Sequence, residues 1–167
     1  MRVLIVRHAI AVSRGTPGFE VDADRPLTPK GIRRMRRNAL GLRRLVTGLE
    51  IIHSSPLARA AETAALVAAA WAGQVKVETS PALAPGAGPA AVLRLLRSGP
   101  AGRTVGLVGH EPGCSALVAF LLTGHQVAEF EFRKGGAALL EVSEDGGRMR
   151  GRLLWHLSPR ILRFAAR

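Results

Sequence analysis

The sequence predicts an α/β fold, a three-layer α/β/α sandwich with a mostly parallel central sheet, on three observations. Short apolar runs alternate with longer helical stretches. Two of those runs end beside a histidine, His8 and His110. The last third of the chain instead contains two extended runs on either side of residues 144–147, which indicates a C-terminal β-hairpin. With 167 residues, 47% of them hydrophobic, the chain is expected to form one domain over residues 1–167.

The first elements follow from β-branched runs and helix-capping residues. Residues 3–6 are all apolar and three of them are β-branched, which suits a strand over residues 2–7 that is covered on both faces. Thr28 followed by Pro29 predicts the start of a helix. Further along we expect a strand over 50–54, a helix over 56–71 and a short strand over 75–78.

The remaining elements complete the alternation. We expect a helix over 89–97, a strand over 104–108, a helix over 112–122, and hairpin strands over 136–142 and 149–157. Residues 82–91, rich in Ala, Gly and Pro, are expected to form a mobile rim of the functional site.

Basic and imidazole side chains stand where these strands end. Arg7 and His8 follow the first strand, and His110 follows the strand over 104–108. Because ligands of α/β proteins bind at the carboxyl ends of the strands, we expect the two histidines to face one crevice. Arg59 lies in the first turn of the helix that follows Ser55. Each signal is weak alone, but three of them in this order form a constellation.

This constellation suits phosphoryl transfer. Arginine presents a planar fork of donors matched to phosphate oxygens, and a neutral imidazole can act as a nucleophile. At about 4 Å and an effective dielectric constant near 20, each arginine attracts a unit negative charge by roughly 4 kcal/mol before desolvation is subtracted. Helix N-termini after Ser55 and His110 would add backbone donors. The residues therefore predict a reaction through a phosphohistidine.

Five motifs extend the pattern over nearly the whole chain. They are Val6-Arg7-His8-Ala9, residues 24–31 (DRPLTPKG), residues 54–63 (SSPLARAAET), Gly109-His110-Glu111-Pro112, and residues 155–159 (WHLSP). They resemble the histidine phosphatase superfamily, which has the phosphoglycerate mutase-like fold. The second and fifth motifs are details of its short SixA-type branch.

The resemblance implies a role for each matched residue. His8 would be the nucleophile that becomes phosphorylated, and Arg7, Arg59 and His110 would hold the phosphoryl group. Arg25 belongs to a shared motif and could reach the leaving group, or it could hold the loop before the helix. No cofactor and no metal is implied, and no Cys, His or carboxylate cluster has metal-ligand spacing. Ala9 stands where the wider superfamily has glycine, which matters only at a positive φ.

A second departure concerns the proton donor. Many superfamily members have a glutamate before the later helix that protonates the leaving oxygen, whereas residues 80–88 contain no acid. General acid catalysis contributes roughly 10²–10⁴-fold for such leaving groups, and the imidazole of phosphohistidine needs it less. The missing acid favours phosphohistidine as substrate. Alternatively Glu62, Glu111 or Glu20 supplies the proton, although a carboxylate at Glu111 is also favoured simply by the helix N-terminus.

These observations predict a cofactor-independent phosphatase, a SixA-like protein phosphohistidine phosphatase of signal transduction. Its partner would be a histidine phosphotransfer-type phosphoprotein, and inorganic phosphate its product. A small-molecule phosphomonoesterase of the same fold, acting on a phosphorylated metabolite, is the alternative, and a non-catalytic phosphate- or nucleic-acid-binding protein comes third. We expect a cytoplasmic protein with no membrane partner, since Cys114 is alone and neither a signal peptide nor a run of 18 apolar residues occurs. We also expect a monomer, since no long heptad or apolar stripe argues for a dimer.

The net charge of +12 is a competing clue for nucleic-acid binding. Many arginines cluster in residues 33–37 and 43–44, on the amphipathic helix after Thr28 that also carries Leu40, Leu42, Leu45 and Val46. Aromatic residues make up only 4% of the chain, which offers no stacking platform, so we do not expect nucleic acid. An arginine-rich coding bias accounts for the charge, or the basic face steers an acidic phosphoprotein toward the site.

Weaker candidates remain outside the constellation. His53, His125 and His156 are interpreted as structural or solvated, and Ser13 and Lys134 rank lower still.

Overall fold

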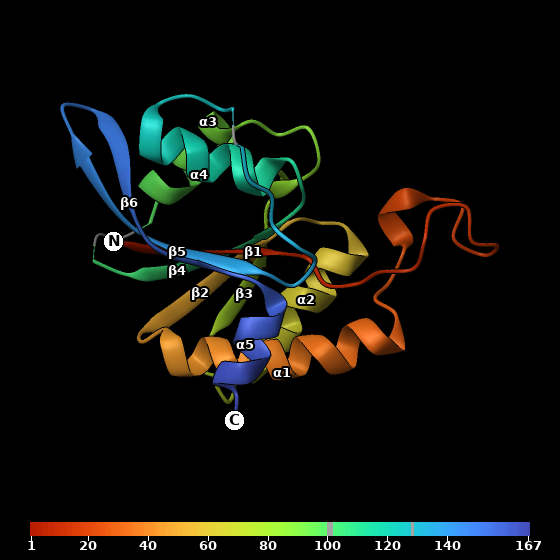
Figure 1. Ribbon diagram of the computed structural model, residues 1–167. Coiled ribbons are helices and arrows are strands. Elements are labelled where there is room, and N and C mark those ends of the chain that lie inside the picture. Colours follow the sequence, from red (N-terminus) through yellow and green to blue (C-terminus); the bar gives the residue numbers. More distant parts are fainter. Residues whose placement is uncertain (100–101, 128) are drawn as a thin grey trace.

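A six-stranded mixed sheet forms the centre of the described chain in this computed structural model, which covers residues 1–99, 102–127 and 129–167 (Figure 1). The strand order is β3-β2-β4-β1-β5-β6. The strands are β1 (Arg2–Arg7), β2 (Leu49–Ser54), β3 (Lys76–Thr79), β4 (Thr104–Gly109), β5 (Ala137–Asp145) and β6 (Arg148–Leu157). Strands β1 to β4 pair in parallel, while β5 is antiparallel to β1 and to β6. The mostly parallel sheet and the C-terminal hairpin are as predicted.

Helices cover both faces of this sheet. Figure 1 shows α1, α2 and α5 below the sheet and α3 and α4 above it. The helices are α1 (Pro29–Leu45), α2 (Ala58–Ala69), α3 (Pro89–Arg97), α4 (Gly113–Thr123) and α5 (Pro159–Ala165), with short 3₁₀ turns η1 (Asp22–Asp24) and η2 (Pro81–Leu83). The predicted three-layer α/β/α sandwich is confirmed. Within the described part of the chain, no helix is both long and apolar enough to cross a membrane.

Strand β1 lies between two hydrophobic cores. Leu4 and Val6 pack into the core under α1 and α2, whereas Val3 and Ile5 pack into the core under α3 and α4. All four side chains are at most 1% exposed. Alternate residues of a strand point to opposite faces, so an unbroken apolar run is what a strand buried on both sides requires. This burial places Arg7 and His8 rigidly at the end of β1.

Helix α1 begins as predicted, and its first turn supports the loop after His8. The Thr28 hydroxyl accepts a hydrogen bond from Gly31 N at 3.0 Å, which is the geometry of an N-cap. Thr28 N donates to Ile10 O at 2.9 Å. A Cβ on Gly31 would lie 2.1 Å from that same oxygen, so only glycine allows this approach. The amphipathic interpretation of α1 holds for Leu42 and Val46, which are buried, but not for Leu40 and Leu45, which are 50% and 40% exposed among the arginines.

Helix α5 is absent from the sequence predictions. It has seven residues and a single fully buried side chain, Leu162, so its hydrophobic periodicity is too short to detect. Its stability comes from docking on α1, where Gly41 leaves room for the backbone of Leu162. The pair Ser158-Pro159 was the one available signal of a helix start.

Several boundaries differ from the prediction by one to three residues. Helix α2 starts at Ala58 rather than 56, because Leu57 is still extended at φ −69° and ψ 135°. It ends at Ala69, two residues early, and β3 starts at Lys76 rather than 75. The hairpin strands reach further into the turn than expected, to Asp145 and from Arg148. Despite these shifts, each residue of the predicted constellation still lies at the end of the strand, or in the first turn of the helix, where the sequence predicts it.

Candidate active site

The two histidines of the predicted constellation lie side by side. His8 follows β1 and His110 follows β4, and these strands are neighbours in parallel register with Arg7 opposite Gly109. Their ring centroids are 5.0 Å apart. Both residues are buried, at 8% and 6% exposure. The carboxyl edge of the sheet therefore brings together residues that are about a hundred positions apart in the chain, as the fold class predicts.

Backbone hydrogen bonds fix His8. His8 N donates to Gly109 O at 2.9 Å, and Gly135 N donates to the carbonyls of Arg7 and His8 at 3.1 Å each. The His8 Nδ1 atom lies 2.7 Å from Ala9 O. A carbonyl oxygen can only accept, so Nδ1 carries the proton and Nε2 keeps its lone pair. Burial lowers the pKa of His8 to about 3, with the charges of Arg59 and Arg7 adding to it, so the ring is neutral.

The peptide after His8 is tied to α2. Ala9 N donates to Thr63 Oγ1 at 3.0 Å, and the Thr63 hydroxyl donates to Arg59 O at 2.6 Å. Among the described residues, the non-glycine position with positive φ is Ala72 and not Ala9. Alanine in place of the glycine of the wider superfamily is therefore accommodated without backbone strain.

The guanidinium groups of Arg7 and Arg59 are held by hydrogen bonds from their Nη atoms, while their Nε–H groups stay free within the described chain. Arg7 Nη1 donates to Phe132 O. Arg59 Nη1 donates to Asp22 O at 2.7 Å, and its Nη2 donates to Asp22 Oδ2 at 2.9 Å. In both arginines Nε is buried and has no partner among the described residues. The planar fork fixes the direction of each free Nε–H.

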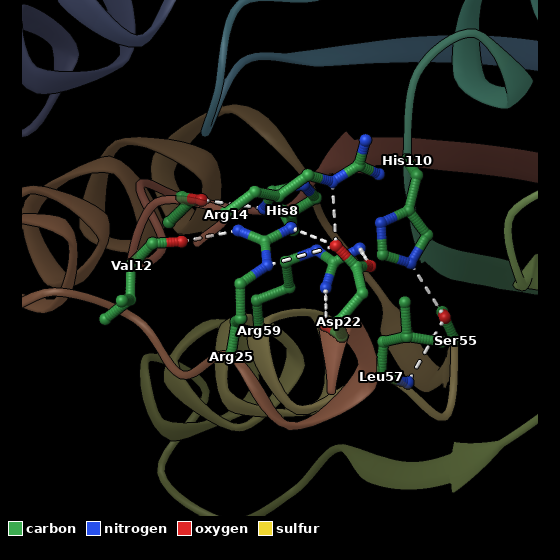
Figure 2. Close-up of polar contacts among 10 residues, drawn as sticks. His8, Val12, Arg14, Asp22, Arg25, Ser55, Leu57, Arg59 and His110 are labelled. Atoms are coloured by element: carbon green, nitrogen blue, oxygen red, sulfur yellow. Dashed lines mark hydrogen bonds and ion pairs between the residues drawn. The ribbon is translucent and has the colours of Figure 1, made fainter. Parts of the chain in front are cut away.

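His110 is likewise held at one ring nitrogen, while its other ring nitrogen has no partner among the described residues. Its Nε2 lies 2.8 Å from Ser55 Oγ, and that oxygen already accepts a hydrogen bond from Leu57 N at 3.4 Å. A hydroxyl can accept two hydrogen bonds and donate one, so Ser55 is able to donate to Nε2; with that direction the ring proton lies on Nδ1. Figure 2 shows the ring beside Asp22 and the arginines, with its Nε2 edge turned toward Ser55. Burial, followed by the charge of Arg59, lowers the pKa of His110 to about 4.

Three buried polar atoms near His8 have no partner among the described residues, namely Arg7 Nε, Arg59 Nε and His110 Nδ1. The His110 ring is 5.0 Å from the His8 ring, and, besides burial, the charges of Arg59 and Arg7 lower the pKa of His8. A buried donor left unpaired costs about 1–3 kcal/mol, so such groups normally mark a binding site. Two of the three belong to cations. The arrangement can accept an anion with several oxygens beside a neutral nucleophilic imidazole.

Asp22 is a site residue that the sequence analysis missed. Its carboxylate accepts from Arg14 Nε at 2.8 Å, Arg25 Nη2 at 2.8 Å and Arg59 Nη2 at 2.9 Å (Figure 2). Partial burial opposes ionisation, but the hydrogen bonds from Arg25, Arg14 and Arg59 hold the pKa of Asp22 well below its usual range. Its position three residues before Arg25, in η1, was the only sequence signal. A carboxylate in this state cannot serve as a proton donor.

Arg25 is fully engaged within the protein. Its Nε and Nη2 donate to Asp22 Oδ1 at 3.1 and 2.8 Å, and its Nη1 donates to Val12 O. These contacts fit the alternative in which Arg25 holds the loop before α1. A direct contact with a leaving group stays a prediction.

The candidate proton donors also have internal partners. Glu111 accepts from Phe132 N through Oε1 and from the Ser115 hydroxyl at 2.7 Å through Oε2. Because Phe132 O accepts a hydrogen bond from Arg7, Glu111 helps to position Arg7 by holding Phe132. Glu62 accepts from Leu27 N at 2.8 Å, and the exposed Glu20 accepts from Gly18 N at 2.8 Å.

An apolar cavity of about 240 Å³ opens beside His110. It lies between the segment from η2 to α3 and the first turns of α4, and Glu111 is the one acid among its described lining residues. Cys114 lines it from α4; burial raises the pKa of this thiol, so it is not a thiolate nucleophile. The predicted rim covers residues 82–91, and its residues 82–89 form one wall of this cavity; the mobility of the rim stays a prediction.

The weaker candidates lie outside the cluster. His53 faces Glu78 at 3.8 Å, and His156 packs against Phe132 with centroids 4.6 Å apart. His125, His156, Ser13 and Lys134 are exposed. Among the described residues, no group of three or more His, Cys, Asp and Glu side chains could hold a metal ion.

Fold and site together define a class of protein, an α/β phosphoryl-transfer enzyme of the phosphoglycerate mutase-like type. The sequence model of the histidine phosphatase superfamily (branch 1) matches residues 3–84. This chain belongs to that superfamily, and its SixA-type character is shown by its structural neighbours. The membership supports phosphatase activity.

Three similar proteins illustrate the relationship. An uncharacterized protein of Picosynechococcus sp. is 35% identical over 155 residues, which cover 87% of this chain and 92% of that protein. The protein histidine phosphatase SixA complexed with tungstate has a TM-score of 0.79 and 28% identity, over 97% of this chain and 99% of its own. The proposed phosphohistidine phosphatase SixA of Agrobacterium tumefaciens has a TM-score of 0.75 and 28% identity, over 95% and 97% of the two chains.

Proposed function

We propose that residues 1–167 act as one catalytic domain, a protein phosphohistidine phosphatase that works through a phosphorylated His8. The single observation that carries the mechanism is the neutral His8 ring, whose Nδ1 is committed to Ala9 O at 2.7 Å. This contact leaves Nε2 as the nucleophile. The three unpartnered donors around the ring supply the binding site for the phosphoryl oxygens.

In the first step, the lone pair of His8 Nε2 attacks the phosphorus atom of the substrate. The P–N bond of the substrate breaks, and its electron pair returns to the departing imidazole, which takes a proton from water. Since Nδ1 of His8 keeps its proton, the phosphorylated ring carries a positive charge. The Ala9 carbonyl faces that charge and stabilises it. Arg7, Arg59 and His110 hold the three equatorial oxygens of the transferred group.

In the second step, a water oxygen attacks the phosphorus atom of phospho-His8. The bond between phosphorus and Nε2 breaks, and its electron pair returns to the ring, which leaves as a neutral imidazole. The water proton is lost to solvent or to the phosphate product. Inorganic phosphate is released, and His8 is restored with the proton on Nδ1 throughout.

The choice of phosphohistidine over a phosphate ester rests on the acids near the site. Asp22 is held ionised by three arginines, and Glu111 and Glu62 are committed to backbone amides. An alkoxide leaving group would lose the roughly 10²–10⁴-fold gain that a general acid provides. An imidazole leaving group loses much less. The SixA-type neighbours support the same choice.

The second candidate is a small-molecule phosphomonoesterase, which the cavity beside His110 favours. Its volume of about 240 Å³ and apolar walls suit the carbon skeleton of a small leaving group. In that case Glu111, which lines the cavity, would have to leave its amide partners and act as the acid.

Competing substrates test the proposal. We would measure turnover of phosphohistidine, free and in a histidine phosphotransfer domain, against p-nitrophenyl phosphate and sugar phosphates, with His8→Ala as control. Preference for the P–N bond that is lost in His8→Ala is the expected result. Faster turnover of the esters, with sensitivity to Glu111→Gln, would establish the phosphomonoesterase instead. The cytoplasmic location and the monomeric state stay predictions that fractionation and light scattering would check.

A further inference from the structure

The basic charge of this chain is concentrated in two segments. Residues 29–45 and 159–167 contain ten of the 24 Lys and Arg residues and none of the 12 Asp and Glu residues. The rest of the chain, with fourteen basic and twelve acidic residues, is nearly neutral although the whole carries +12. A coding bias would raise arginine throughout, but it would not remove every acid from these two segments. Composition alone therefore does not account for the pattern.

The two segments form one surface. A Cβ on Gly41 of α1 would lie 2.0 Å from Leu162 O of α5, so the two backbones touch. Arg44 Nη1 donates to Ala165 O at 3.1 Å, and Arg163 Nη1 donates to Asn38 Oδ1 at 3.1 Å. We call their outer side the α1/α5 face; its cations are Lys30, Arg33, Arg34, Arg36, Arg37, Arg43, Arg44, Arg160, Arg163 and Arg167.

These ten cations have no acidic partner among the residues that the structure describes. The ion pairs of the molecule use other cations, such as Arg59, Arg97 and Arg152. Burial and the charges of Arg34 and Arg37 lower the pKa of Arg163, so the like charges are close enough to repel one another. A face that keeps unpaired repelling charges is stabilised by an anionic partner.

Large apolar side chains project between the cations. Leu40, Leu45, Ile161 and Phe164 are 50%, 40%, 48% and 67% exposed. Apart from Pro29, the exposed residues of both segments are either Lys and Arg or large and apolar, with no hydroxyl or amide side chain among them. Surfaces that lie on membranes combine these two kinds of residue, since cations meet headgroup phosphates and apolar side chains enter the boundary with the acyl chains.

Nucleic acid fits this composition less well. Base edges are read by arginine together with amide, hydroxyl and carboxylate side chains, and single strands need aromatic platforms. The α1/α5 face offers one aromatic residue, Phe164, whose ring already carries the Arg167 guanidinium 5.7 Å from its centroid.

We propose that the α1/α5 face binds the surface of membranes that contain anionic phospholipids, with Ile161 and Phe164 inserted between the headgroups. Figure 1 shows this face on a different side of the molecule from the carboxyl ends of β1 and β4. Docking therefore leaves the active site open to its substrate. The expectation of no membrane partner rested on the absence of a spanning segment, which a surface contact does not need.

Sedimentation with lipid vesicles tests the proposal. The full chain is mixed with vesicles of phosphatidylcholine, with or without phosphatidylglycerol, over a series of NaCl concentrations. We expect binding only to the anionic vesicles, weakening with salt. The variant R33E/R36E/R37E should lower the partition coefficient by at least about 100-fold, because each basic residue near the surface contributes about 1 kcal/mol. Ile161→Ser together with Phe164→Ser should lower it by roughly 10-fold.

The matched control removes the same charge elsewhere. R94E/R148E/R150E changes three exposed arginines outside the face and should bind within about 3-fold of wild type. Thermal melts and phosphatase activity should be unchanged in every variant, which shows that each one folds. The proposal is wrong if anionic vesicles are not bound, if the control loses as much binding as R33E/R36E/R37E, or if the Ile161 and Phe164 changes have no effect. Tighter binding to duplex DNA than to vesicles at equal salt would assign the face to nucleic acid instead.

Discussion

Arginine has two different roles in two regions of this molecule, and burial decides which one. At the active site, Arg59 is 3% exposed and Arg25 is 8% exposed, and each is aimed by the acceptors it contacts. On the α1/α5 face, all the arginines except the half-buried Arg163 are exposed, and none of them has an acidic partner within the described chain. Buried arginines act through directed hydrogen bonds, whereas exposed ones act together through a field that salt screens within about 8–10 Å. The location of an arginine, rather than the number of arginines, sets its function.

The largest effect is expected at the nucleophile itself. His8→Ala should reduce turnover by at least about 10³-fold, because no other described side chain at the site offers an equivalent lone pair. Acid-labile phosphate on the protein, measured after rapid quenching, should disappear as well. The control is His53→Ala, which removes a histidine that faces Glu78 and should keep turnover near wild type. Residual phosphorylation of His8→Ala would show that another residue is the nucleophile.

The exchange Arg59→Lys tests whether a buried arginine needs its hydrogen-bond geometry as well as its charge. Lysine keeps the charge but loses the fork that both contacts Asp22 and presents Nε, so kcat/KM should fall by about 10²-fold. On the exposed face the same exchange, Arg36→Lys, should leave kcat/KM unchanged because only charge matters there. If both exchanges changed kcat/KM equally, buried and exposed arginines would not differ in how they act.

The substitution Asp22→Asn tests whether Asp22 positions Arg59. Loss of the negative charge should tighten inhibition by tungstate, an anion, while the weaker hold on Arg59 should lower kcat by about 10-fold. Opposite changes in inhibitor affinity and kcat are the signature of a positioning residue, which a merely structural defect would not produce. Asp24→Asn, in the same turn but exposed, serves as the control. A parallel loss of affinity and kcat would show that Asp22 instead maintains the site as a whole.

The last prediction concerns the dependence of stability on pH. The pKa values of His8 and His110 are lowered from 6.5 to about 3 and about 4. Between those values and 6.5, the unfolded chain binds protons that the folded chain does not. The stabilisation that depends on the two neutral histidines should therefore be complete above pH 6.5. Below that pH, the free energy of unfolding should decrease by about 1.4 kcal/mol per pH unit for each histidine. Urea titrations between pH 5 and 7.5 should show a shallower dependence for His8→Asn than for wild type; equal slopes would contradict the buried neutral ring.

Local patterns explain which parts of this molecule the sequence predicts well. Strand β1 and the start of α1 depend on a β-branched run and on the pair Thr28-Pro29, which act over a few residues. The meeting of His8 and His110 follows from the parallel sheet, because its strands share one carboxyl edge. The arginine signature at Arg59 follows from its place in the first turn of α2.

The parts that the sequence does not reveal depend on contacts between distant segments. Asp22 is recognisable as a site residue only because it meets Arg59, 37 positions later in the chain. Helix α5 exists because it packs on Gly41, more than a hundred residues earlier. Neither contact leaves a periodic signal. The support of Arg7 by Phe132 O, across 125 positions, is of the same kind.

The hydroxyl of Ser55 has a consequence for how many molecules are ready to react. A neutral imidazole can carry its proton on either nitrogen, and only the Nδ1 form of His110 can donate into the site. When the Ser55 hydroxyl, 2.8 Å away, donates to Nε2, it holds the ring in that form. A chain without this hydroxyl would exchange rapidly between the two tautomers, and its kcat would fall in proportion to the fraction of time spent in the Nδ1 form.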